Sequence, residues 1–247
     1  VKVQNVSLNM RRFILAHEAF KAFSEMQPGA YIKWLFDKNG KPLNNLEAAR
    51  EDVVMRTYTV RALNNEIGTM TVDCALHEST GFDGPAQNWA RSAQIGDNLS
   101  ITFPPGSIKQ LPDHFDVAVF VGDMTAMPAI ETYFETLSKD TQGHAFISIE
   151  SQKDIRDLKN PNALNIHWLY KTEKSLVDHV RDLGKPKGKI ALWSATEFND
   201  MRELRQLFSN EWAMARNDYY ISSYWKLGRS DEEHKRDKRK DAESIAS

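Results

Sequence analysis

A short segment of the chain combines a cation and an aromatic ring at strand spacing. In Arg56-Thr57-Tyr58-Thr59, period-two alternation places Arg56 and Tyr58 on the same face of a predicted strand. A guanidinium can clamp a phosphate, and a tyrosine ring can stack on a flat ligand. On its own, the tetrapeptide is better explained as an ordinary exposed strand face.

A second segment, residues 81–90, reads Gly-Phe-Asp-Gly-Pro-Ala-Gln-Asn-Trp-Ala. Glycines and a proline that lead into a helix leave backbone N–H groups directed at an anion. The same residues are also typical of a simple helix that begins at a proline, so both interpretations stay open at this point.

Two further segments each follow a predicted parallel strand. Residues 122–130 read Gly-Asp-Met-Thr-Ala-Met-Pro-Ala-Ile, and residues 224–229 read Tyr-Trp-Lys-Leu-Gly-Arg. The carboxyl ends of parallel strands are where such sheets bind ligands. Core packing would explain the aromatic residues of the last segment but not its two bases.

Other kinds of chemistry lack support. The chain has no GxGxxG, P-loop, HExxH or GxSxG motif, and its seven histidines include no pair at metal-ligand spacing. The single cysteine, Cys74, excludes an internal disulfide, and no bound metal is expected. With 32 basic and 34 acidic residues among 247, bulk charge does not favour nucleic-acid binding.

The elements that must position these segments change in character near residues 109–115. Before that point, strands are expected over 12–15, 31–36, 53–62, 69–77 and 98–103, with a short helix over 85–93. Five or six such strands indicate a small closed antiparallel barrel.

After residue 112, strands alternate with helices. Strands are expected over 116–122, 144–150, 165–170, 189–194 and 219–225, and helices over 128–138, 174–183 and 197–208. This alternation predicts a doubly wound parallel sheet, and hence two domains, 1–112 and 113–247. The tail, residues 230–247, has six acids and five bases and is expected to form a solvated, frayed terminal helix.

In this order and spacing, the segments resemble the siderophore-interacting protein family of ferric-siderophore reductases, relatives of ferredoxin–NADP reductases. The matching pieces are residues 56–59, Asp73-Cys74-Ala75-Leu76-His77, and residues 84–90, 122–130 and 224–229. The resemblance implies a six-stranded β-barrel that binds FAD non-covalently, followed by an α/β domain for a nicotinamide.

The resemblance also implies roles for individual residues. Arg56 would hold the pyrophosphate, Tyr58 would pack on the isoalloxazine, and Thr59 would hydrogen-bond near the flavin N5. Tyr58, Thr59 and Thr125 would be the catalytic residues. The remaining cofactor-binding positions would be Asp73, His77, Gly84, Pro85, Ala86, Trp89, Asp123, Thr125, Glu150, Ser194 and Glu197.

The implied reaction passes electrons from NADH or NADPH through FAD to Fe(III) in a siderophore and so releases Fe(II). Lys226, Arg229 and, third, Lys33 are the expected bases for an anionic ferric siderophore. Glu150 slightly favours NADH, because an acid binds ribose hydroxyls and repels a 2′-phosphate. Lys153 and Arg156 could instead attract a 2′-phosphate and so favour NADPH.

Three alternatives remain. Thr196 stands where the family often has glycine, which leaves a ferredoxin-type protein donor open. A general flavin-dependent NAD(P)H oxidoreductase would share both domains and differ only in its acceptor. A non-enzymatic siderophore-binding or iron-delivery protein would have the fold without retaining FAD.

The expected surroundings follow from what the sequence lacks. With no apolar run of about 18 residues and no signal-peptide pattern at its start, the chain is expected in the cytoplasm without membrane insertion. No nucleic-acid partner is expected. A monomer is expected, since no long heptad repeat is evident.

Overall fold

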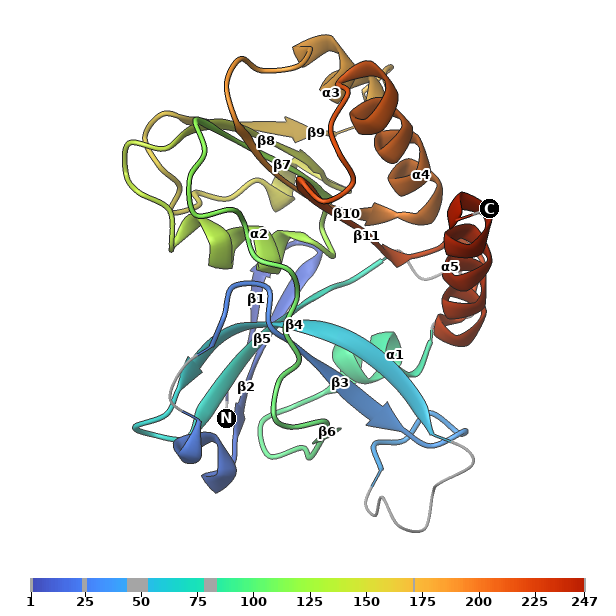
Figure 1. Cartoon of the computed structure of the whole chain (residues 1–247). Helices are drawn as coiled ribbons and strands as arrows, with labels where there is room; N and C mark the ends of the chain where they lie inside the picture. Colours follow the sequence, from blue (N-terminus) through green and yellow to red (C-terminus); the bar gives the residue numbers. More distant parts are fainter. Residues whose placement is uncertain (1, 24–25, 44–52, 78–83, 171, 247) are drawn as a thin grey trace. The chain divides into compact units, whose positions relative to one another are not determined.

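The computed structural model describes residues 2–23, 26–43, 53–77, 84–170 and 172–246 (Figure 1). Its contacts divide the chain into two compact units. Unit 1 contains Val1–Ile108, Pro128–Thr136 and Glu150–Leu158, and unit 2 contains Lys109–Met127, Leu137–Ile149 and Lys159–Ser247. Two segments from the second half of the chain therefore belong to unit 1. Residues 81–83 of the predicted anion-binding segment lie outside the described residues.

Unit 1 is built on one antiparallel sheet of six strands in the order β1-β2-β5-β4-β3-β6, as expected. The strands are β1 Val3–Ser7, β2 Met10–Ala16, β3 Tyr31–Phe36, β4 Val54–Asn64, β5 Thr69–Ala75 and β6 Ser100–Ile101. The sequence did not predict β1, and the strand expected over 98–103 is reduced to two residues. In the described part of the chain, no ladder joins the outermost strands β1 and β6.

Alternating side chains of this sheet form the core of unit 1. Phe13, Ile32, Trp34 and Val72 are at most 1% exposed and come from three different strands. Helix α1, Pro85–Ser92, adds its buried alanines to the same cluster. This burial fixes which face of β4 turns inward, because a strand's side chains alternate between the two faces.

Unit 2 contains a parallel sheet of five strands in the order β11-β10-β7-β8-β9. The strands are β7 Val117–Asp123, β8 Gln142–Ser148, β9 Leu164–Leu169, β10 Ile190–Glu197 and β11 Tyr219–Trp225. The helices of the second half are α2 Met127–Phe134, α3 Leu176–Leu183, α4 Phe198–Gln206 and α5 Asp231–Ala246. The strand order reverses between β7 and β10, and ligands of such sheets bind outside the carboxyl ends at that point.

Helix α5 differs from the solvated tail expected from its composition. His234 is 4% exposed and shares a hydrogen bond of 2.8 Å with Ser223 of β11. Lys238 donates to the Ser223 carbonyl at 3.0 Å, and Asp241 accepts from Arg205 of α4 at 2.7 Å. These three residues follow helical spacing, so one stripe of α5 docks on β11 and α4. The prediction of a frayed helix is wrong for this stripe.

No helix within the described ranges is long and apolar enough to cross a membrane. The same ranges contain no group of three His, Cys, Asp or Glu side chains arranged to hold a metal ion.

Candidate cofactor and substrate sites

Strand β4 presents Arg56 and Tyr58 on one face of unit 1. The register pairs Trp34 of β3 with Arg56, which places the indole diagonally across from Tyr58. The Trp34 and Tyr58 rings stack with centroids 3.9 Å apart and planes at 30°. Trp34 is fully buried and Tyr58 is only partly buried, so the core holds the phenol in a fixed orientation. A ring held in this way can support a planar ligand.

The beginning of α1 lies beside the Arg56 guanidinium. Gly84 caps the helix in an extended conformation (φ −67°, ψ 163°) without a side-chain cap. A Cβ built on Gly84 would lie 4.0 Å from Nη2 of Arg56 and meets nothing else within that distance. Helix N-termini attract anions through their unpaired N–H groups. We call Arg56, Gly84 and the N–H groups of Ala86 and Gln87 the phosphate cradle.

The predicted residue Trp89 positions α1 from within the core. Its ring centroid lies 5.0 Å from that of Phe13 and 5.1 Å from that of Trp34. Ala86 is 3% exposed, and Pro85 has no N–H group to donate. The side chains of these residues therefore fix the helix, and only the backbone of Ala86 is placed to contact an anion.

Asp73 and His77 occupy two different settings. Both carboxylate oxygens of Asp73 accept from Arg12, at 2.6 Å from Nε and 2.7 Å from Nη2, and the Asp73 side chain is fully buried. Arg12, which the sequence did not single out, thus donates to both oxygens of the carboxylate that was predicted to approach the cofactor. His77 follows β5, and its carbonyl accepts from Arg91 of α1. The predicted cofactor contacts of both residues stay predictions.

In unit 2, Asp123 at the end of β7 is held by three donors. Its Oδ1 accepts from the Thr125 backbone N–H at 2.8 Å and from the Thr125 hydroxyl at 2.5 Å. Its Oδ2 accepts from Nε1 of Trp225 at 2.7 Å. The structure therefore brings together Asp123, Thr125 and the end of β11, which belong to two segments that the sequence singled out separately.

Glu197 completes this edge at the end of β10. One carboxylate oxygen caps α4 by accepting from the Asn199 N–H, and the other accepts from the Leu227 N–H at 3.1 Å. Burial, together with Glu197 and Asp123, raises the pKa of Asp200 to about 6. We call Asp123, Glu197 and Asp200 the acidic edge, which lies at the carboxyl ends of the two strands at which the sheet order reverses.

Ser194 and Thr196 precede Glu197 on β10, and both are fully buried. The Thr196 hydroxyl donates to the Glu197 carbonyl at 3.1 Å, so a β-branched residue is accommodated where a glycine was expected. Among the described residues, the Ser194 hydroxyl has no hydrogen-bond partner. Its predicted contact with a cofactor stays untested.

The three bases predicted for the substrate lie on different elements. Lys33 pairs with Thr57 in the β3–β4 register, so it projects from the face opposite Arg56 and Tyr58. Lys226 and Arg229 follow β11 in unit 2 and make ion pairs with α5.

The residues considered for donor preference differ in exposure and in partners. Arg156 makes an ion pair with Glu131, which accepts from Arg61 as well, at 3.1 Å. Glu131 is 7% exposed, so Arg156 is committed to a buried carboxylate. Glu150, two residues after β8, and Lys153 are exposed.

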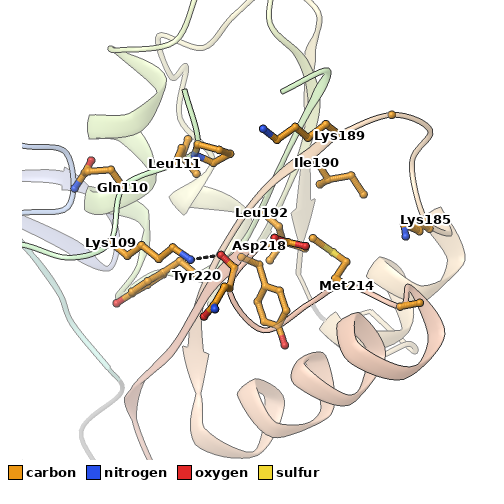
Figure 2. A pocket seen from close by; sticks show the side chains of 15 residues that line it. Lys109, Gln110, Leu111, Lys185, Lys189, Ile190, Leu192, Met214, Asp218 and Tyr220 are labelled. Carbon is orange, nitrogen blue, oxygen red and sulfur yellow. Dashed lines mark hydrogen bonds between the residues drawn. The ribbon is translucent and has the colours of Figure 1, made fainter. Parts of the chain in front are cut away.

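A pocket of about 380 Å³ lies at the opposite edge of the unit 2 sheet, beside the first residues of β10 and β11 (Figure 2). Lys109, Lys185 and Lys189 lie at its rim, and Leu192 and Met214 line it. Lys109 donates to the carbonyl of Asn217. This edge carries none of the residues that the sequence singled out.

Sequence reasoning missed residues whose role depends on distant partners. Arg12, Trp34 and Trp225 act through contacts with residues of other strands or loops. For Trp225, its place in a matching segment was a signal, but nothing in the sequence named Asp123 as its partner.

Comparison with known proteins gives concordant matches. The chain is 28% identical over 246 residues to ferric vibriobactin reductase ViuB of Vibrio cholerae serotype O1, covering 94% of this chain and 89% of that protein. It is 25% identical to the NADPH-dependent ferric-chelate reductase of Escherichia coli strain K12, covering 85% of each. The structure of the siderophore-interacting protein SipS from Aeromonas hydrophila matches with a TM-score of 0.84 and 28% identity, over 98% of this chain and 95% of that one.

Two family models match consecutive parts of the chain. Residues 1–108 match the siderophore-interacting FAD-binding domain, and residues 115–228 match the siderophore-interacting protein model. Together with the six-stranded antiparallel sheet, the five-stranded parallel sheet and the two candidate sites, these matches establish that the chain belongs to the siderophore-interacting protein family.

Proposed function

We propose that this protein is an FAD-dependent ferric-siderophore reductase that uses a nicotinamide as electron donor. The observation that carries the proposal is the phosphate cradle, in which Arg56 lies beside the uncapped N-terminus of α1 and on the strand face that carries Tyr58. A dinucleotide flavin needs both an anion site and a flat support for its ring.

Each part of the cradle has a distinct task. The Arg56 guanidinium and the N–H groups of Ala86 and Gln87 would bind the pyrophosphate. Tyr58, stacked on Trp34, would support the isoalloxazine and limit its movement. Burial keeps the pKa of the Tyr58 phenol well above its usual value, so the ring beside the flavin is uncharged at neutral pH.

Bound FAD would supply the redox chemistry, accepting an electron pair from the nicotinamide and passing electrons singly to Fe(III). The protein would orient the two ligands and exclude water. Fe(II) binds hard oxygen ligands less tightly than Fe(III), so reduction releases the iron. Because the flavin would carry the electrons, the reaction needs no strongly basic or nucleophilic side chain. Consistent with this, Asp123 and Glu197 of the acidic edge accept hydrogen bonds from donors of their own unit.

We further propose that the nicotinamide binds at the acidic edge, where Asp123, Thr125 and Glu197 lie. NADH is the favoured donor in this proposal. Glu150 is exposed for ribose hydroxyls, and Arg156 is committed to Glu131 instead of a 2′-phosphate. The name of the Escherichia coli relative refers to NADPH, so the donor of this chain is a direct test of the argument.

The test is a steady-state assay with a chromogenic Fe(II) chelator, the FAD-loaded protein, a ferric siderophore, and NADH or NADPH. Fe(II) should form only when protein, FAD and nicotinamide are all present, with a higher kcat/KM for NADH. Formation of Fe(II) with a reduced ferredoxin but with neither nucleotide would favour the protein donor. Reduction of quinones with every ferric siderophore left untouched would favour a general flavin oxidoreductase.

Two other properties belong to the same proposal. The protein is expected to be a monomer and to act in the cytoplasm, where nicotinamides and the released Fe(II) are used. Size-exclusion chromatography with light scattering and cell fractionation check these two expectations.

A further inference from the structure

The bases at the end of β11 are paired with acids of α5. Nζ of Lys226 lies 2.7 Å from Oδ2 of Asp237 and 4.3 Å from the ring centroid of Phe198. Arg229 lies 3.3 Å from Glu233 through Nη1 and 3.5 Å from Asp237 through Nε. These two bases and two acids, which we call the β11–α5 charge cluster, carry no net formal charge.

The acids of this cluster are held in place by the docking of α5. His234, Lys238 and Asp241 fasten the helix to β11 and α4, as described above. Glu233 also accepts from the Ser230 backbone N–H at 2.9 Å. Asp237 and Glu233 therefore face the bases because of the helix's own packing, whether or not a ligand is present.

Both acids carry charge at neutral pH. The hydrogen bond from Lys226 lowers the pKa of Asp237, and the bonds from Ser230 lower the pKa of Glu233. A polyanion that approached Lys226 and Arg229 would thus meet two carboxylates together with the two cations. Leu227 lies between these bases in the chain and is 77% exposed, so the segment also offers an apolar contact.

Ferric siderophores differ in net charge according to their ligand groups. A hydroxamate carries one negative charge and a catecholate carries two, so a ferric trihydroxamate is neutral and a ferric tricatecholate is a trianion. A basic surface would attract the trianion, whereas a cluster without net charge gives it no advantage.

We infer that Asp237 and Glu233 act as a charge filter, which cancels the electrostatic advantage that Lys226 and Arg229 would otherwise give trianionic ferric tricatecholates over neutral ferric trihydroxamates. The inference rests on the proposed function, because it names the substrate class of that reaction. Asp237 is a specificity-determining residue in this account, since it contacts both bases through one carboxylate oxygen. Removing its charge leaves the cluster with a net positive charge.

The expected effect follows from Coulomb's law. At a separation of about 7 Å in a largely aqueous setting, the loss of one carboxylate favours a trianion by roughly three- to fivefold in affinity after salt screening. A neutral complex should change by less than about twofold on the same scale.

Gallium(III) complexes provide a test that does not depend on electron transfer. Gallium(III) has the charge and a size close to those of Fe(III), but the flavin does not reduce it. Dissociation constants of gallium trihydroxamate and gallium tricatecholate would be measured by tryptophan fluorescence on the FAD-loaded full chain. The variants are Asp237→Asn, Glu233→Gln and Glu243→Gln, the last removing an exposed acid from the same helix.

Asp237→Asn should bind the tricatecholate roughly three- to fivefold more tightly than the parent, with the trihydroxamate nearly unchanged. Glu233→Gln should shift the ratio of the two dissociation constants in the same direction by a smaller factor, and Glu243→Gln should leave this ratio unchanged. Equal changes for both complexes, no change, or no binding of either complex by any form would overturn the inference. If no Fe(II) forms but the ratio of dissociation constants for the two gallium complexes still changes in the variants, the result would count against the proposed function instead.

Discussion

The phosphate cradle of unit 1 and the acidic edge of unit 2 are opposite in charge. The cradle offers a guanidinium and helix N–H groups, and the first turn of α1 contains no acidic residue. The acidic edge gathers Asp123, Glu197 and Asp200 at the ends of β7 and β10. The first arrangement attracts a diphosphate, and the second carries the opposite charge.

The two regions also differ in how their polar groups are satisfied. Asp123 and Glu197 accept from Trp225, Thr125, Asn199 and Leu227, so the acidic edge is ordered without a ligand. Gly84 provides no side-chain cap for α1, and the first N–H groups of a helix can bind an anion. We therefore expect changes in the cradle to alter ligand retention, and changes at the edge to alter positioning and pH dependence.

Asp73→Asn should have the largest effect, and it should be on stability. The substitution breaks a buried bidentate pair with Arg12, which costs about 3 kcal/mol in unfolding free energy. FAD affinity should change little, because the Asp73 carboxylate already has both oxygens on Arg12. Urea unfolding and flavin titration measure the two quantities, with Glu66→Gln as an exposed control. Strong flavin loss at unchanged stability would place Asp73 in the cradle after all.

Arg56→Ala should weaken FAD binding by roughly 10- to 100-fold, because a charge-assisted contact to phosphate contributes about 1.5–3 kcal/mol. The flavin absorbance that remains after gel filtration gives the occupancy. Arg239→Ala removes the same side chain from an exposed position and should retain FAD fully. Equal occupancy in the two variants would contradict the assignment of the cradle.

Trp225→Phe removes one of the donors that hold Asp123. The remaining bonds from Thr125 keep the carboxylate at the edge but leave one oxygen free to turn. We expect KM for the nicotinamide to rise about fivefold, as the loss of one hydrogen bond of about 1 kcal/mol predicts, with kcat nearly unchanged. Trp168→Phe on β9 serves as the control, and a fall in kcat alone would contradict a positioning role.

Asp200→Asn should show its effect in the pH dependence of stability. The Asp200 pKa is about 6 in the folded protein and 3.8 as its ordinary value. The folded state thus binds the proton more tightly than the unfolded state, and this contribution to stability is lost as pH rises from about 4 to about 6. The variant has no carboxyl group to titrate and does not lose this contribution. Its free energy of unfolding should therefore rise relative to that of the parent between about pH 4 and about pH 6, and the difference should persist at higher pH. A difference in unfolding free energy between variant and parent that is the same at every pH would refute the raised pKa.

Much of the fold follows from local patterns in the sequence. The continuous apolar runs 117–121 and 190–193 have the character of buried parallel strands, and they became β7 and β10. The alternation in residues 31–36 and 53–62 likewise gave β3 and β4. Strand β1 escaped prediction because its residues, Val-Gln-Asn-Val-Ser, are mostly polar and pair only with β2.

The candidate sites were predictable where one element carries the group. The β4 tetrapeptide places Arg56 and Tyr58 without reference to any other segment. Pairings across the chain were not predictable, because Arg12 meets Asp73 over 61 positions and Trp225 meets Asp123 over 102. The same limit concealed α5, whose alternating charges gave no sign that His234, Lys238 and Asp241 face β11 and α4.

The central claim is that electrons pass from the flavin to siderophore-bound iron. The most direct test is an anaerobic single-turnover experiment, in which the FAD-loaded protein is reduced with one equivalent of NADH and then mixed with a ferric trihydroxamate. We predict bleaching of the flavin band by NADH and its full recovery on mixing, with two Fe(II) formed per flavin. A flavin that stays bleached in the presence of neutral and anionic ferric siderophores alike would contradict the account.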